Sequence, residues 1–171
     1  MKRNSLLLFG ILILLCTSVS IAQSGFIKIG DIQGDASDRD HKEWIVIESF
    51  NQGLEQPPLG ATGTTRRRDA VVLNDLTVTK KLDKSTPKLM EYCAKGQVVP
   101  KLELDLVDSG KVYYKITLDN ARISSINTVT LCEPDCEFMD IVGISYSKIT
   151  WEYSEGRKGK VVGSYNGERG N

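Results

Sequence analysis

The sequence predicts a mainly β protein, with about seven or eight antiparallel strands and one short helix beside them. Apolar and polar residues alternate with a period of two through most of the chain after its N-terminus. The segment 101–120 shows this most clearly, because alternating leucines lead into Asp108-Ser109-Gly110 and a second alternating run follows. Two alternating runs joined by a tight turn are typical of a β-hairpin. One segment, 83–97, breaks the alternation.

Further strands are predicted on both sides of this hairpin. They are expected within 26–32, 43–50, 69–80, 121–131 and 140–155. In the last of these segments the apolar positions change phase near Lys148, which predicts a β-bulge, because one extra residue moves the following side chains to the other face. Residues 156–171 are rich in glycine and charge, and we expect them to form a flexible C-terminal tail.

The segment that breaks the β pattern has the start and stop signals of a helix. Ser85 or Thr86 can cap the N-terminus, and Pro87 has the backbone angle of a first helical turn. Gly96 can end the helix. Three residues fall on one face and are expected to pack against the sheet: Leu89, Cys93 and Ala94.

The N-terminus has the three parts of a secretory signal peptide, which we assign to residues 1–22. Two positive charges come first, an apolar run of about ten residues ends at Leu15, and Ser20 and Ala22 are small where a signal peptidase cleaves. A membrane anchor is one alternative, but a spanning helix needs about 20 apolar residues. Lipidation at Cys16 is another, although Leu15 stands where that processing needs a small residue. We therefore expect a periplasmic or secreted protein.

The mature chain would hold about 149 residues, enough for one domain with a real core, which we assign to residues 23–155. Loss of two cations with the leader changes the formal net charge from 0 to about −2. A nearly neutral chain has no electrostatic preference for nucleic acid or an anionic membrane, so neither is expected as a partner.

The segment 30–44 raises the question of a site, because it holds four aspartates and the single histidine of the chain, His41. A calcium loop started at Asp31 would need glycine and glutamate where the chain has Ala36 and Lys42. Zinc would need more nitrogen or sulfur ligands, and acid–base chemistry would need a pocket and a positioned partner. We favour a hairpin loop whose Asp and Ser side chains satisfy the turn backbone. No catalytic, cofactor-binding or metal-binding residue is therefore predicted.

Three cysteines remain after cleavage: Cys93, Cys132 and Cys136. Export permits a disulfide, and Pro134 favours a tight turn that can bring Cys132 and Cys136 together. We expect these two to be joined and Cys93 to remain a free, mostly buried thiol. Two alternatives stay open, in which Cys93 pairs with one of the two or all three are reduced.

The segment 26–53 resembles the opening of the haemolysin-coregulated protein (Hcp) family, whose members form the tube of type VI secretion. In that family an apolar strand is followed by a Gly-acidic-small-x-Asp-x-x-His loop and a strand ending in Ser-Phe. The matching residues here are Gly34, Asp35, Ala36, Asp38, His41, Ser49 and Phe50. The similarity continues in 76–96, which is similar to the family's strand and its Asp-Lys-Ser-Ser-Pro helix, and in 144–153.

The resemblance implies a compact antiparallel β-barrel with one flanking helix. It also implies homo-hexameric rings that stack into a tube and carry small effector proteins, with no catalysis in the core domain. The long loop 52–69 would then reach a neighbouring subunit, which places Arg66, Arg67 and Arg68 at an interface. A solvated loop and anion binding are the alternatives for these arginines.

Two features depart from the family pattern: the export signal and the Cys132–Cys136 segment. Both suit a protein that folds outside the cytoplasm. We therefore predict a secreted, ring-forming Hcp-like structural protein that needs no cofactor and is not an enzyme. One alternative is an exported, monomeric binding protein with the same fold. An enzyme built around His41 is the other.

Overall fold

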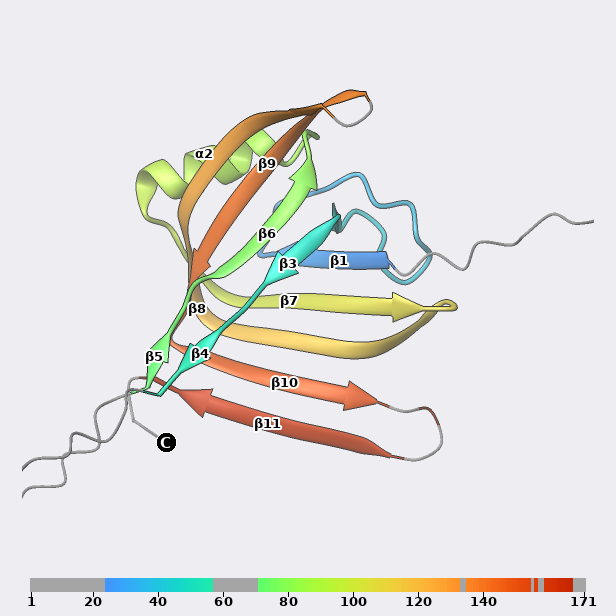
Figure 1. Cartoon of the computed structure of the whole chain (residues 1–171), viewed down its shortest axis with the longest axis vertical. Helices are drawn as coiled ribbons and strands as arrows, with labels where there is room; N and C mark the ends of the chain where they lie inside the picture. The colour runs from blue at the N-terminus through green and yellow to red at the C-terminus, as the bar shows by residue number, and fades with distance from the viewer. Residues whose placement is uncertain (1–23, 57–70, 133–134, 155, 157–158, 168–171) are drawn as a thin grey trace, which may run out of the picture.

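A computed structural model describes residues 24–56, 71–132, 135–154, 156 and 159–167 of the chain. These residues form eleven β-strands and one helix, α2, so the predicted mainly β class with one short helix is confirmed (Figure 1). The elements are β1 (Ser24–Ile29), β2 (Ile45–Ile47), β3 (Ser49–Asn51), β4 (Leu54–Glu55), β5 (Val72–Leu73), β6 (Leu76–Lys81), α2 (Thr86–Lys95), β7 (Val98–Asp108), β8 (Lys111–Cys132), β9 (Cys136–Ser145), β10 (Lys148–Ser154) and β11 (Lys160–Asn166).

Nine of the described strands form one antiparallel sheet with the order β2-β1-β7-β8-β9-β6-β3, to which β10 and β11 are added beside β8. The long strand β8 organises this arrangement. Its first half pairs with β10 and its second half with β9. Between the halves lies Asn120, whose φ of 52° turns the backbone where the pairing partner changes. The β4–β5 pair continues the ribbon of β3 and β6 as a separate two-stranded sheet.

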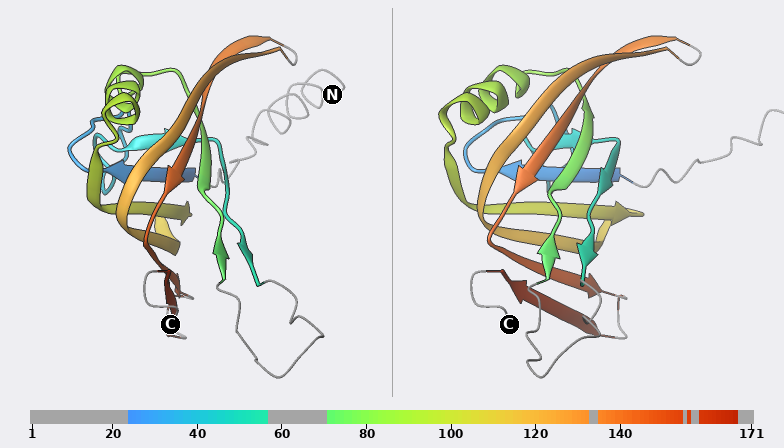
Figure 2. Two further views of the ribbon diagram at one scale, coloured as in Figure 1. Left: turned by 90° about the vertical axis from the view of Figure 1, so that its left-hand side faces the viewer. Right: turned by 60° about the vertical axis from the view of Figure 1, so that its left-hand side comes forward.

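The sheet curls round its core like a barrel, but its hydrogen-bonded ladder is not closed all the way round (Figure 2). Its two end strands, β2 and β3, are separated in the chain by Glu48 alone. β2 pairs with β1, β3 pairs with β6, and the Glu48 N–H donates to the Thr79 carbonyl at 2.8 Å. β2 and β3 are therefore connected through the chain and not by strand pairing. In the expected closed barrel these two end strands would be hydrogen-bonded to each other.

The core is built from the inward positions of these strands. Directly opposite residues form rows across the sheet, for example Ile27, Leu104 and Ile116 on β1, β7 and β8. All three are buried, as are Val78 and Val142 in the row that joins β6 and β9. Removing these apolar surfaces from water is the main stabilising term for such a sheet, at about 25 cal/mol per Å².

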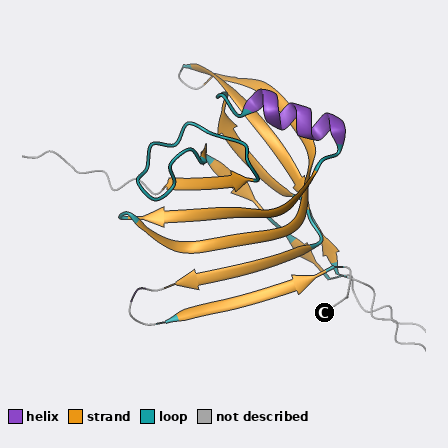
Figure 3. Ribbon diagram, turned by 180° about the vertical axis from the view of Figure 1, so that it is seen from behind, coloured by secondary structure: helices purple, strands orange, loops and turns teal. Residues whose placement is uncertain are grey.

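The helix follows its sequence signals. α2 begins after Ser85, has Pro87 in its first turn and stops before Gly96, whose φ of 60° is the left-handed C-cap. It packs against β8 and lies across one end of the curved sheet (Figure 3). Its inward residues are Thr86, Leu89 and Tyr92, whereas Cys93 is only partly buried and Ala94 is exposed. The predicted inward face was therefore correct for Leu89 and wrong for Ala94.

The expected bulge near Lys148 is instead a junction between two strands. β9 ends at Ser145 and β10 begins at Lys148, and they pair with different halves of β8. The inward apolar positions change from even-numbered to odd-numbered residues because inward and outward side chains alternate separately in each of the two strands.

The expected flexible tail also contains a strand. β11 pairs with β10 over seven residues, with Tyr165 opposite Ile149 and packed against the core. The sheet therefore continues beyond the predicted domain boundary at residue 155. Glycines at 159, 163 and 167 concealed the short apolar pattern of this segment.

Candidate functional site

His41 is packed in a small buried cluster on the face of β1 and β7 that points away from the main core. Its side chain is 5% exposed. The imidazole stacks on Phe26 with ring centroids 4.5 Å apart and forms a T-shaped contact with Trp44, at a centroid separation of 4.8 Å. Its Nδ1 lies 2.8 Å from Asp38 Oδ1 and its Nε2 lies 3.1 Å from Asp105 Oδ2. Both ring nitrogens are thus used inside the fold, and the ring fixes the loop to the sheet.

The loop around His41 is held by the hydrogen bonds predicted for its acidic side chains. Asp38 Oδ1 accepts the backbone N–H groups of Asp40 and His41, each at 3.0 Å. The hydrogen bond from His41 also holds the pKa of the Asp38 carboxyl below its ordinary value. Gly34 passes so close to β2 that a Cβ there would lie 2.4 Å from Ile45 Cα. These contacts support the structural interpretation of the segment.

Asp105 is the member of this cluster that sequence analysis missed. It lies on β7, 64 residues from His41, and its side chain is buried. Lys115 on β8 approaches its other oxygen at 3.3 Å. Little in the sequence indicated that Asp105 would contact His41. Asp105 lies on the outward face of a β-strand, where a charged residue is ordinary.

A second buried polar cluster joins β6, β8, β9 and α2. Lys80 is 1% exposed, and its Nζ lies 2.9 Å from Asp140 Oδ2 and 2.8 Å from Asp83 Oδ1. Thr86 and Thr128 donate their hydroxyls to Asp140. Burial alone would raise the pKa of Asp140, but the hydrogen bonds from Thr86, Lys80 and Thr128 outweigh it, so the pKa lies below its ordinary value. The cluster fixes the start of α2 to the sheet.

Neither cluster has the form of a metal centre. Among the residues that the structure describes, no three or more His, Cys, Asp and Glu side chains are grouped to hold a metal ion. Likewise, no helix within the described segments is long and apolar enough to span a membrane.

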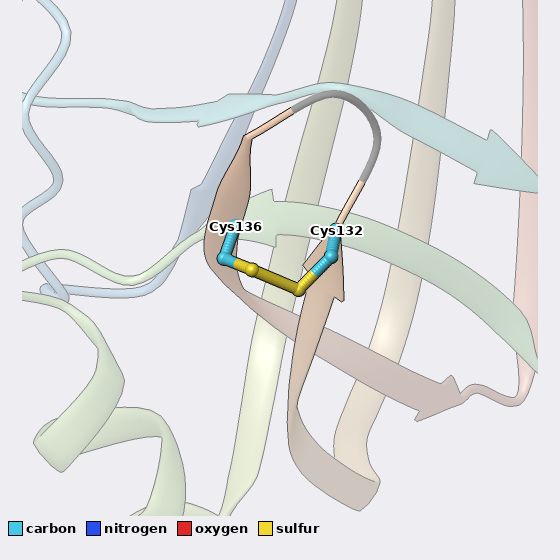
Figure 4. The surroundings of a disulfide bond; sticks show 2 residues. All are labelled: Cys132 and Cys136. Atoms are coloured by element: carbon cyan, nitrogen blue, oxygen red, sulfur yellow. A yellow bond between two sulfur atoms is a disulfide. The ribbon is translucent and has the colours of Figure 1, made fainter.

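The hairpin of β8 and β9 ends in a disulfide between Cys132 and Cys136 (Figure 4). Their Cα atoms are 3.9 Å apart, and the two residues are partners in the strand register. Cys93 is a free thiol on α2 and is half-buried. The predicted interface residues Arg66, Arg67 and Arg68, and the predicted signal peptide at 1–22, lie outside the described residues.

This pairing leads to a prediction about the mature protein. We expect peptide mapping without reduction to recover one crosslinked peptide holding Cys132 and Cys136, with Cys93 open to alkylation. Because the bridge spans only four positions of the sequence, replacing both cysteines by serine should lower the free energy of unfolding by less than about 3 kcal/mol. A crosslinked peptide containing Cys93, or three alkylated thiols, would refute the assignment.

Two exposed apolar surfaces continue the core face of the sheet beyond the core. On the β8–β9 hairpin, Phe138 stands two residues beyond Asp140 on the same face and is 60% exposed. Exposed Leu82 lies beside it, since the Leu82 N–H donates to the Phe138 carbonyl. We call Phe138 and Leu82 the arm surface.

The other exposed end lies on β10 and β11. There, buried Ile149 is followed on the same face by Trp151 and then by exposed Tyr153. Val161 of β11 is directly opposite Tyr153 and is 71% exposed. We call Tyr153 and Val161 the edge surface, because β11 pairs only with β10 among the described strands. Paired apolar residues at the open margin of a sheet are typical of a contact with another chain.

A scan against models of protein families matches residues 26–153 to the family described as "Type VI secretion system effector, Hcp". This match covers the sheet from β1 to β10 together with the helix. The chain belongs to the Hcp family. The sequence resemblance is thereby confirmed, and so is the family's β fold.

Known Hcp proteins agree with this assignment. Protein hcp1 of Pseudomonas aeruginosa is 36% identical over 107 residues, which are 60% of this chain and 66% of that protein, just under two thirds of its length. The structure of Hcp1 from Salmonella typhimurium has a TM-score of 0.73 at 23% identity, covering 87% of this chain and 97% of the other. A type VI secretion system effector from Yersinia pestis gives 0.71 at 22% identity, covering 83% and 98%. At this identity the two structures show the shared fold.

Proposed function

We propose that this protein is exported, forms homo-hexameric rings as a structural Hcp component of type VI secretion, and carries small effector proteins. The single observation that carries the proposal is the family match over residues 26–153, which spans ten of the eleven described strands and the helix. A curved sheet with exposed apolar ends supports it, because such ends are stabilised when a second subunit covers them.

The proposal assigns no reaction to the protein. His41 has both ring nitrogens occupied by carboxylates, and it is packed between two aromatic rings. The Lys80 cluster joins structural elements and is likewise satisfied internally. The assembled ring, with effector as cargo, is then the functional unit, and no cofactor is required.

The N-terminal signal and the disulfide hairpin belong to the same proposal. Cleavage after Ala22 would release a mature chain into an oxidising compartment, where Cys132 and Cys136 can stay joined. Arg66, Arg67 and Arg68 are proposed to lie in a loop that contacts a neighbouring subunit.

The test is the mass of the mature chain in solution. Residues 23–171 should have six times the mass of one chain by light scattering at high micromolar concentration, at low and high salt. A single-chain mass over the whole range of concentration and salt would reject the ring.

A further inference from the structure

We propose that the arm surface of one copy binds the edge surface of a second copy. This inference rests on the proposed self-assembly and names the two surfaces that meet. Each surface is a pair of neighbouring apolar residues on the core face of the sheet, Phe138 with Leu82 and Tyr153 with Val161. Joining them would continue the apolar core from one molecule into the next.

The two surfaces cannot meet within one molecule. Phe138 is opposite Thr130 on β8, and Tyr153 is opposite Tyr114 on the same strand. These two positions on β8 are sixteen residues apart, which corresponds to about 50 Å along the strand. The tip of the β8–β9 hairpin and the β10–β11 hairpin accordingly lie at opposite ends of the protein (Figures 1 and 3). A contact between unlike surfaces at two ends of a molecule is head-to-tail, which is the kind of contact that closes into rings.

Apolar area, more than charge, carries the proposed pairing. A groove beside Leu82 is also lined by Val46, and its carboxylates Asp35 and Asp83 are already paired with Lys84 and Lys80. On β11, Lys160 is likewise paired with Glu152 inside the same hairpin. The stabilisation of the contact would therefore come from removing the exposed apolar side chains of both surfaces from water.

The disulfide prepares the arm for such a contact. Cys132 and Cys136 close the hairpin two residues beyond Thr130 and Phe138, on the same face. A stapled hairpin loses less conformational freedom on binding than an open one, so more of the contact energy appears as affinity.

The experiment uses two blocking variants of the full mature chain, Phe138→Asp on the arm and Val161→Asp on the edge. Each is expected to lose assembly and show the mass of one chain. Equimolar mixing should restore a dimer, because the intact edge of one variant meets the intact arm of the other. Leu131→Asp and Val162→Asp are matched controls, on the opposite faces of the same hairpins and 52% and 56% exposed. Both should keep the wild-type mass.

The outcomes separate the two proposals. A monomeric wild type rejects the ring and this inference with it. Assembly of the wild type together with unchanged assembly of Phe138→Asp and Val161→Asp rejects only the inference. Two monomeric variants that stay monomeric when mixed also reject it, because the surfaces would then not meet each other. Should either variant fail to fold by circular dichroism, Leu82→Asp and Tyr153→Asp test the same two surfaces.

Discussion

Replacing Lys80 by methionine is expected to lower the free energy of unfolding by about 3–5 kcal/mol. The substitution keeps an unbranched side chain only one atom shorter, but leaves Asp140 buried without its cation. Thr86 and Thr128 would still donate to the carboxylate, although neither can compensate its charge. Urea denaturation of the mature protein, with fluorescence of the tryptophans, measures the loss.

Lys81→Met is the matched control for this experiment. Lys81 is the next residue, and its ion pair with Glu137 is exposed on both sides. Exposed pairs contribute between 0 and about 1 kcal/mol, so this variant should be nearly as stable as the wild type. Equal effects of Lys80→Met and Lys81→Met would show that the buried cluster contributes little.

The Asp140 pKa gives the same cluster a dependence on pH. Because the pKa is lower in the folded protein than in the unfolded chain, the carboxylate stabilises the fold above about pH 3.9. This contribution is lost as the pH falls through the lowered folded pKa. The difference between wild type and Lys80→Met should therefore shrink on acidification, since a neutral Asp140 no longer needs a cation.

His41→Ala is expected to lower the free energy of unfolding by about 3 kcal/mol while leaving self-assembly unchanged. The variant removes a ring packed between Phe26 and Trp44 and exposes a cavity in that small cluster. It also leaves the buried Asp105 with Lys115 as its remaining charged neighbour. Thermal unfolding and light scattering of the same sample give the two quantities.

Lys42→Ala serves as the control, because Lys42 is the exposed neighbour of His41 in the same loop. It should change neither quantity. A His41→Ala protein that is fully stable but no longer assembles would show that the loop belongs to an interface and that its structural interpretation is wrong.

The repeated β pattern and the helix were predictable because each depends on local sequence. Alternation gave the strands of the hairpin at 101–120, and Ser85, Pro87 and Gly96 gave the limits of α2. Strand β11 was not predictable in this way. Its register with β10 brings Tyr165 onto Ile149, which only the tertiary fold can provide.

The candidate sites show the same division. The bonds from Asp38 to the turn backbone are local, as predicted for the acidic side chains of this loop. Asp105, by contrast, reaches His41 only because β1 and β7 pair. Lys80 and Asp140 each occupy an inward strand position, where a charged side chain contradicts the alternation. A lysine and an aspartate at inward positions of two different strands could have indicated the buried ion pair, because buried charges are usually paired.

The central claim is that this Hcp protein works as a closed assembly of identical subunits. Electron microscopy of the purified mature chain tests it most directly. We expect class averages of rings with six-fold symmetry. Fields that contain only single barrel-sized particles, at concentrations where the protein is folded, would contradict the claim.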